Sequence, residues 1–96
     1  MTSTTVVIKL YFKKEVEVGS LNACFNLSIV EDYEEGFAWN KKAITWIKEP
    51  TSEIEIVLII NMAIRYHFGY GCTVNLSKAK ELYNKALYWN SNIAEK

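Results

Sequence analysis

The chain has 96 residues, enough for one small domain with a single hydrophobic core. Its 11 basic and 11 acidic residues balance, so the chain as a whole lacks the attraction to phosphate that nucleic-acid-binding proteins use. Half of the residues are hydrophobic, which argues against a disordered chain.

Nothing in the sequence indicates export or a membrane span. The most apolar run, residues 54–64, contains Glu55 and Asn61 and is far shorter than the roughly 20 residues that cross a bilayer. The N-terminus has no basic and apolar leader, so we expect a cytoplasmic protein with neither membrane nor nucleic acid as a partner. Cys24 and Cys72 show no CxxC spacing, and we expect two reduced thiols rather than one disulfide.

Four glycines and one proline divide the chain into segments of helical length. The first predicted helix covers about residues 5–18 and ends at Gly19, a residue suited to the left-handed conformation. Ser20 can cap the second helix, residues 21–33, in which apolar residues recur every three or four positions. Residues 34–36 are then predicted to break the helix.

The third predicted helix covers residues 37–48, and Pro50 follows its end. Ser52 and Glu55 have the spacing of a capping box, so a fourth helix is expected from there to about Phe68. This helix is apolar nearly all round, which predicts a central and buried position.

Asn75 can cap the fifth predicted helix, residues 76–89, and Asn90 is predicted as its left-handed cap. Two segments leave an alternative open. Residues 4–8 and 54–60 are rich in β-branched side chains and are compatible with strands.

An internal repeat favours the helical interpretation. Three segments align, each centred on a lysine, with a mean spacing of about 36 residues, the length of one helical hairpin in a repeat protein. The segments are residues 11–16, 39–44 and 82–87, and the aligned lysines are Lys14, Lys42 and Lys85.

On these segments the sequence resembles the Sel-one-like repeat family, a relative of the tetratricopeptide repeats. The most specific match is residues 66–86, where a tyrosine is followed by a Gly-x-Gly loop, a capping asparagine and two Lys-Ala pairs. Weaker matches begin at Gly19 and Glu35. The middle repeat lacks its Gly-x-Gly loop, and Glu31 stands where the family has tyrosine.

The resemblance implies an all-α fold, a five-helix right-handed superhelical stack of antiparallel hairpins. It divides a single domain, residues 1–96, into about two and a half degenerate repeats. These are a half repeat at about 5–19, a repeat at about 20–49 and a repeat at about 51–92. Small residues such as Ala43 and Ala86 fit close contacts between paired helices.

The residue pattern offers little for catalysis. His67 is the sole histidine, and neither cysteine lies in a nucleophile motif. Gly69-Tyr70-Gly71 follows a helix and lacks the GK[ST] of a phosphate loop. We therefore expect no enzyme, metal or cofactor, and an active site around Glu31, Asp32 and His67 is the disfavoured alternative.

A partner-binding surface is instead expected. The resemblance implies that the first helix of each hairpin lines the concave side of the stack. Helical spacing then gives one stripe in each of two hairpins. The first stripe is Asn22, Phe25, Ile29 and Asp32, and the second is Val57, Ile60, Ile64 and His67. The alternative is that their apolar members are simply core. Trp46 and Trp89 stand where the family is polar, and residues 31–35 are the strongest acidic cluster. The predicted partner-binding residues are Phe25, Ile29, Glu31, Asp32, Glu34, Glu35, Trp46, Ile64, His67 and Trp89.

These features predict a small module that binds one protein and masks it, such as an immunity protein for a toxin or an inhibitor of an enzyme with a basic surface. A bacterial adaptor, or a fragment of a longer repeat array, is the alternative. The last helix has no further hairpin to cover it, so it has to expose an apolar face, pack on the C-terminal tail or dimerise. A homodimer through the C-terminal helix is one of these three alternatives.

Overall fold

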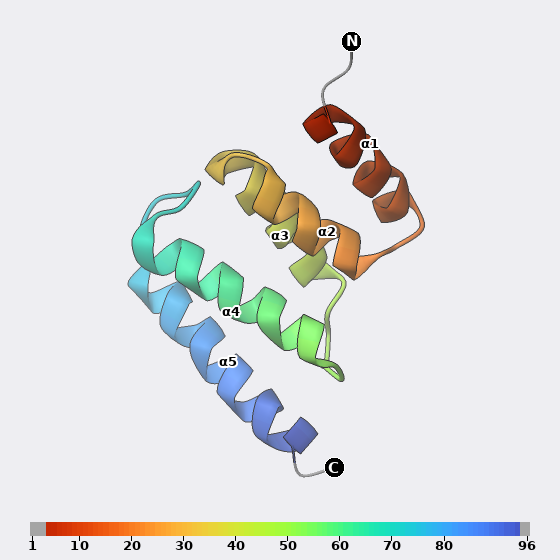
Figure 1. Cartoon of the computed structure of the whole chain (residues 1–96). Coiled ribbons are helices and arrows are strands. Elements are labelled where there is room, and N and C mark those ends of the chain that lie inside the picture. The colour runs from red at the N-terminus through yellow and green to blue at the C-terminus, as the bar shows by residue number, and fades with distance from the viewer. Residues whose placement is uncertain (1–3, 95–96) are drawn as a thin grey trace.

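The computed structural model describes residues 4–94, which form five α-helices (Figure 1). No strand occurs in this part of the chain, so the all-α prediction is confirmed. The strand alternative is wrong, because residues 4–8 and 54–60 lie within helices. The helices are α1 (Thr4–Glu17), α2 (Leu21–Val30), α3 (Tyr33–Thr45), α4 (Glu53–Phe68) and α5 (Leu76–Ala94).

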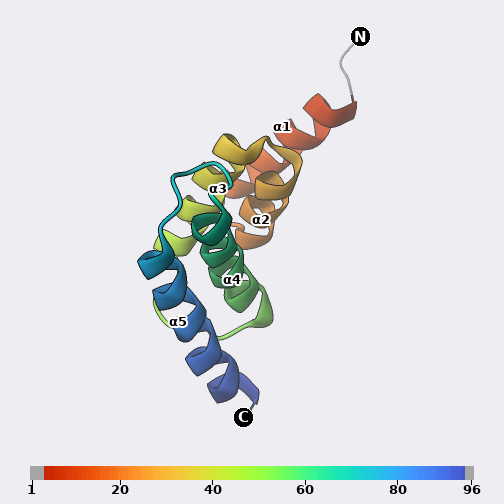
Figure 2. The same ribbon diagram turned by 90° about the vertical axis from the view of Figure 1, so that its left-hand side faces the viewer.

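Each helix packs on the next one along the chain, and α2 also contacts α4. The pairs α2–α3 and α4–α5 are antiparallel neighbours, and α1 and α5 lie at opposite ends of the molecule (Figures 1 and 2). The resulting body measures 48 × 32 × 17 Å. Since a helix with its side chains is about 10 Å across, the shortest dimension holds no more than two helical layers.

The connection between α2 and α3 differs from the sequence prediction. The second helix ends at Val30 instead of Tyr33, and the third begins at Tyr33 instead of Phe37. Asp32 causes this, because its carboxylate accepts a hydrogen bond from the backbone N–H of Glu35 at 2.9 Å and so caps a helix that starts early.

Gly36 therefore lies inside α3 and does not interrupt it. It is buried, and a Cβ at this position would come within 2.5 Å of the carbonyl oxygen of Ser28 in α2. The prediction of a break is wrong. A glycine inside a helix costs some conformational entropy, but here it allows α2 and α3 to approach closely, and the packing between them outweighs that cost.

Some of the other helix ends lie where the sequence predicts them, and some do not. Gly19 and Gly69 have positive φ angles of 84° and 75° at the ends of α1 and α4, and Asn75 caps α5 by accepting from the backbone N–H of Lys78 at 3.0 Å. Helix α3 stops at Thr45, three residues early. Asn90 is not a cap, since α5 continues to Ala94; an asparagine ends a helix only where the chain must turn.

The capping box before α4 forms in a modified way. Ser52 is the cap residue, but its hydroxyl donates to Glu55 at 2.8 Å and does not accept from the backbone. The Glu55 carboxylate also accepts from the hydroxyl of Thr51 at 3.2 Å. The glutamate therefore holds the entry to the helix as predicted, whereas the serine half of the motif is missing.

The predicted central position of α4 is confirmed. This helix alone supplies five buried residues, and Leu58, Ile59 and Ala63 have no exposed surface. Leu27 of α2 and Ala43 of α3 are equally buried against it in one continuous core. None of the described helices combines the length and the apolar character that a bilayer crossing requires.

Candidate interaction surface

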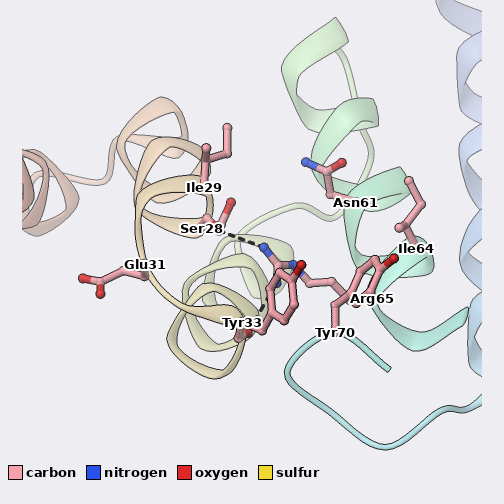
Figure 3. A pocket seen from close by; sticks show the side chains of 8 residues that line it. All are labelled: Ser28, Ile29, Glu31, Tyr33, Asn61, Ile64, Arg65 and Tyr70. Atoms are coloured by element: carbon pink, nitrogen blue, oxygen red, sulfur yellow. Dashed lines mark hydrogen bonds between the residues drawn. The ribbon is translucent and has the colours of Figure 1, made fainter. Parts of the chain in front are cut away.

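A cavity lies between α2 and α4, and one residue of each predicted stripe, Ile29 and Ile64, lines it. The cavity has a volume of about 260 Å³ and is lined from the α2 side by Ser28, Ile29 and Glu31. Asn61 and Ile64 line it from α4 (Figure 3). The structure therefore brings Ile29 and Ile64 to one cavity from two helices that are distant along the chain.

Arg65 of α4 forms part of the cavity wall and ties three segments together. Its guanidinium donates to the carbonyl of Ser28 at 2.9 Å and to the carbonyl of Tyr33 at 3.4 Å (Figure 3). It also donates to the amide oxygen of Asn40 at 3.3 Å. Asn40 is itself fully buried and donates to the carbonyl of Leu58 at 3.0 Å.

This network places a positive charge in a partly buried position. Burial lowers the pKa of the Arg65 guanidinium from its ordinary value, but arginine remains charged because that value is so high. The hydrogen bonds to three oxygens compensate the lost hydration, and they hold the end of α2, the start and middle of α3 and the last turn of α4 in one arrangement.

A row of stacked rings borders the cavity. Tyr33 stacks on Tyr70 with ring centroids 5.0 Å apart, Tyr70 on Phe68 at 5.6 Å, and Phe68 on His67 at 4.3 Å. We call these four residues the aromatic row. Tyr33 is 64% exposed, Phe68 56% and Tyr70 38%, so the row is open to solvent although its members contact one another.

The acidic cluster of residues 31–35 divides into two parts. Asp32, Glu34 and Glu35 are exposed, and Glu34 lines a hollow together with Tyr33 of the aromatic row. Glu31 is different, since it pairs with Lys9 of α1 at 3.1 Å and its side chain is only 8% exposed. In Figure 3 it points away from the cavity. Its carboxylate holds α1 onto α2, whereas the other three form an acidic edge.

The remaining predicted residues lie elsewhere. Phe25 and Trp89 are half-buried against the core, as the core alternative expects. Trp46 is exposed at the end of α3, and the Lys42 ammonium lies 5.9 Å from its ring. His67 ends the aromatic row, with Nδ1 3.4 Å from the hydroxyl oxygen of Tyr83.

Helix α5 has an apolar groove of its own beside α4. It has a volume of about 430 Å³ and is lined by Ile60, Tyr83, Ala86, Leu87 and Asn90. Leu87 is exposed, as is the neighbouring Tyr88. The predicted homodimer through the C-terminal helix would use this groove, and it stays a prediction.

Sequence reasoning missed Tyr33, Arg65, Phe68 and Tyr70. The Gly-x-Gly loop was interpreted only as a chain reversal, but Gly71 lies directly against the backbone of Tyr33 and brings Tyr70 onto the Tyr33 ring. A tyrosine between two glycines was the available signal, because a large ring in a tight turn has to pack on something outside the turn.

Cys24 is a buried free thiol and Cys72 is a half-buried one. Burial raises the pKa of both Cys24 and Cys72, which keeps them as protonated thiols at neutral pH, whereas a nucleophile needs the thiolate. Cys72 donates to the carbonyl of Arg65 at 3.3 Å. Across residues 4–94 no three His, Cys, Asp or Glu side chains gather as metal ligands would.

No family model, no curated protein and no solved structure matches this chain. Its function has to be inferred from the aromatic row, the cavity and the acidic edge.

Proposed function

We propose that this chain is a small protein-binding module of the Sel-one-like type that binds one partner and masks it, as an immunity protein masks a toxin. The order of helix contacts supports a repeat of this kind. Successive helices pair, and α2 and α4, the proposed first helices of two hairpins, touch each other. Such a stack presents an extended surface for a partner.

The single observation that carries the proposal is the exposed aromatic row beside the cavity. Tyr33, Phe68 and Tyr70 are large rings that remain open to solvent, and Ile29 adds an exposed aliphatic side chain at the cavity. Tyrosine and phenylalanine are enriched at the centres of protein interfaces, where they bury much area at a small cost in side-chain entropy. A continuous exposed patch of this kind is typical of a docking site.

The charges near the row indicate a basic partner. Asp32, Glu34 and Glu35 are exposed at the start of α3, and across residues 4–94 the ion pairs are Lys9–Glu31 and Lys78–Glu81, so none of the three is neutralised within the described part of the chain. Uncompensated carboxylates around an apolar patch accelerate association with a positively charged surface and favour it over a neutral one.

Tyr70→Ala is expected to weaken partner binding about 30-fold, because a stacked tyrosine at the centre of an interface is worth about 2 kcal/mol. The partner is first identified by affinity capture and mass spectrometry. The dissociation constant and the stoichiometry are then measured by calorimetry with the purified pair. Tyr88→Ala, a tyrosine on α5 that is 63% exposed against 38% for Tyr70, is the control. A larger loss in Tyr88→Ala would move the site to the α5 groove.

Glu34→Lys is expected to reduce the association rate of a basic partner severalfold at low salt, with a smaller change in the dissociation rate. Glu53→Lys is the control, since Glu53 is also exposed in the first turn of a helix but lies on α4. Asp32 is left intact, because its carboxylate caps α3. Stopped-flow mixing measures both rates, and equal association rates for the two variants would refute a role for the acidic edge.

A further inference from the structure

The solvent face of α3 carries a symmetric pattern of charges. Two glutamates, Glu34 and Glu35, stand in its first turn, and two lysines, Lys41 and Lys42, stand toward its end. Ala38 lies midway between them, and all five residues are exposed. The opposite side of the helix is buried through Gly36, Asn40 and Ala43. Ala38 therefore marks the middle of the exposed face.

These charges cannot neutralise one another along their own helix. Glu34 and Lys41 are seven residues apart, as are Glu35 and Lys42, which puts each pair on one side of the helix but about 10 Å apart along its axis. Helical ion pairs form at spacings of three or four. The ion pairs of residues 4–94, Lys9–Glu31 and Lys78–Glu81, use none of these four groups.

The two lysines have ring neighbours instead of carboxylates. The Lys41 ammonium lies 5.9 Å from the Phe37 ring centroid, and the Lys42 ammonium lies 5.5 Å from that of Trp39. The Lys42 ammonium also lies 5.9 Å from the Trp46 ring centroid. Each ring face occupies one side of an ammonium group, so with three N–H donors both lysines keep a donor free for an oxygen acceptor. Both ammonium groups are therefore positioned and still able to bind a carboxylate.

We propose that two copies of this chain associate through α3, antiparallel, about a two-fold axis at Ala38. The two-fold rotation reverses the direction of α3 in the second copy. A side chain on one lateral side of the contact in the first copy stays on that side in the second copy, but it lies toward the opposite end of the contact. Glu34 then faces Lys41 of the second copy, and Glu35 faces Lys42 of the second copy, each offset by about one residue rise of 1.5 Å. The methyl group of Ala38 permits a close approach at the axis.

The occupant is a second copy because the pattern is complementary to itself. A partner surface of one sign that covered the whole length of α3 would be attracted by one half of the helix and repelled by the other half. An antiparallel copy of α3 matches both halves at once, and two-fold contacts of this kind close the assembly at a dimer. The contact contains four ion pairs, two from the glutamates of each copy. These ion pairs are exposed, so the dimer is weak and sensitive to salt.

This contact goes beyond the proposed function and does not depend on it. Glu34 and Glu35 belong both to the acidic edge and to the α3 contact. Self-association and the binding of a basic partner therefore compete for the same carboxylates, and a partner with sufficient affinity would separate the dimer.

Sedimentation equilibrium between about 10 µM and about 1 mM protein tests the contact. The unaltered chain is expected to dimerise, with at least a tenfold weaker dimer in about 0.5 M salt than in about 0.05 M. The double variants E34K/E35K and K41E/K42E are each expected to be monomeric, because α3 then carries one sign of charge. Mixed together, they are expected to form a one-to-one heterodimer.

Opposite net charge alone could attract the two variants, so a second mixture serves as control. E49K/E53K and K48E/K80E carry the same changes of net charge at exposed positions outside α3. Each is expected to keep the dimer of the unaltered chain. Ala38→Arg, which places two like charges at the axis without touching the core, is expected to abolish it. A monomeric unaltered chain at 1 mM, or a dimer that survives Ala38→Arg, would overturn the proposal.

Discussion

Gly71→Ala is expected to lower the free energy of unfolding by about 2–4 kcal/mol. Two costs add at this position. The residue has a φ of +80°, which costs a non-glycine residue about 1 kcal/mol or more. A Cβ would also collide with the backbone carbonyl of Tyr33 and approach the Cα of Glu34 at 3.0 Å, and overpacking of this kind costs about 1–3 kcal/mol.

The variant Gly19→Ala distinguishes the cost of the positive φ from the cost of overpacking. Gly19 has almost the same φ, +84°, but a Cβ there has nothing within 4 Å, so only the backbone cost of about 1 kcal/mol is expected. Urea unfolding followed by circular dichroism measures both variants. Equal losses would mean that the loop does not press on the start of α3.

Gly71→Ala should also affect the binding of a partner. The loop has to move away from α3 to admit the Cβ, which separates the Tyr70 ring from the Tyr33 ring. Partner binding is therefore expected to fall in Gly71→Ala and to persist in Gly19→Ala, even when both variants are folded at the assay temperature.

Arg65→Met is expected to lower the free energy of unfolding by about 3 kcal/mol. Methionine fills much of the same space but donates no hydrogen bonds, so the amide oxygen of Asn40 and the carbonyl of Ser28 lose their partner. Asn40 is fully buried, and leaving a buried acceptor unsatisfied costs about 1–3 kcal/mol.

Two further variants define the role of this side chain. Arg65→Lys keeps the charge but lacks the planar fork that reaches three oxygens, and about half of the loss is expected. In the double variant Arg65→Met, Asn40→Ala the two losses should be smaller than additive, because both residues belong to one network. Additive losses, or a loss below about 1 kcal/mol in Arg65→Met, would contradict a shared role.

Local features of the sequence were sufficient for the all-α class and for several helix ends. Gly19, Gly69 and Asn75 act through the backbone of their own turn, so their effect does not depend on what packs nearby. The apolar character of the 54–64 segment also identified the central helix, since a helix without a polar face has to be buried.

The same reasoning could not place the interaction surface. Gly36 and Gly71 were interpreted as breaks or turns, yet each lies where one backbone meets another. Glu31 was grouped with its acidic neighbours, yet Lys9 of another helix neutralises it. These outcomes depend on contacts between segments distant in sequence, which no local pattern records.

By itself, then, the sequence determined that the chain forms five helices and where several of them end, because capping and hydrophobic periodicity act within one or two turns. The tertiary structure decided which side chains share a surface. Arg65 joins α2, α3 and α4, and the loop at Gly71 carries Tyr70 onto Tyr33, so the cavity and the aromatic row form only once the helices have packed.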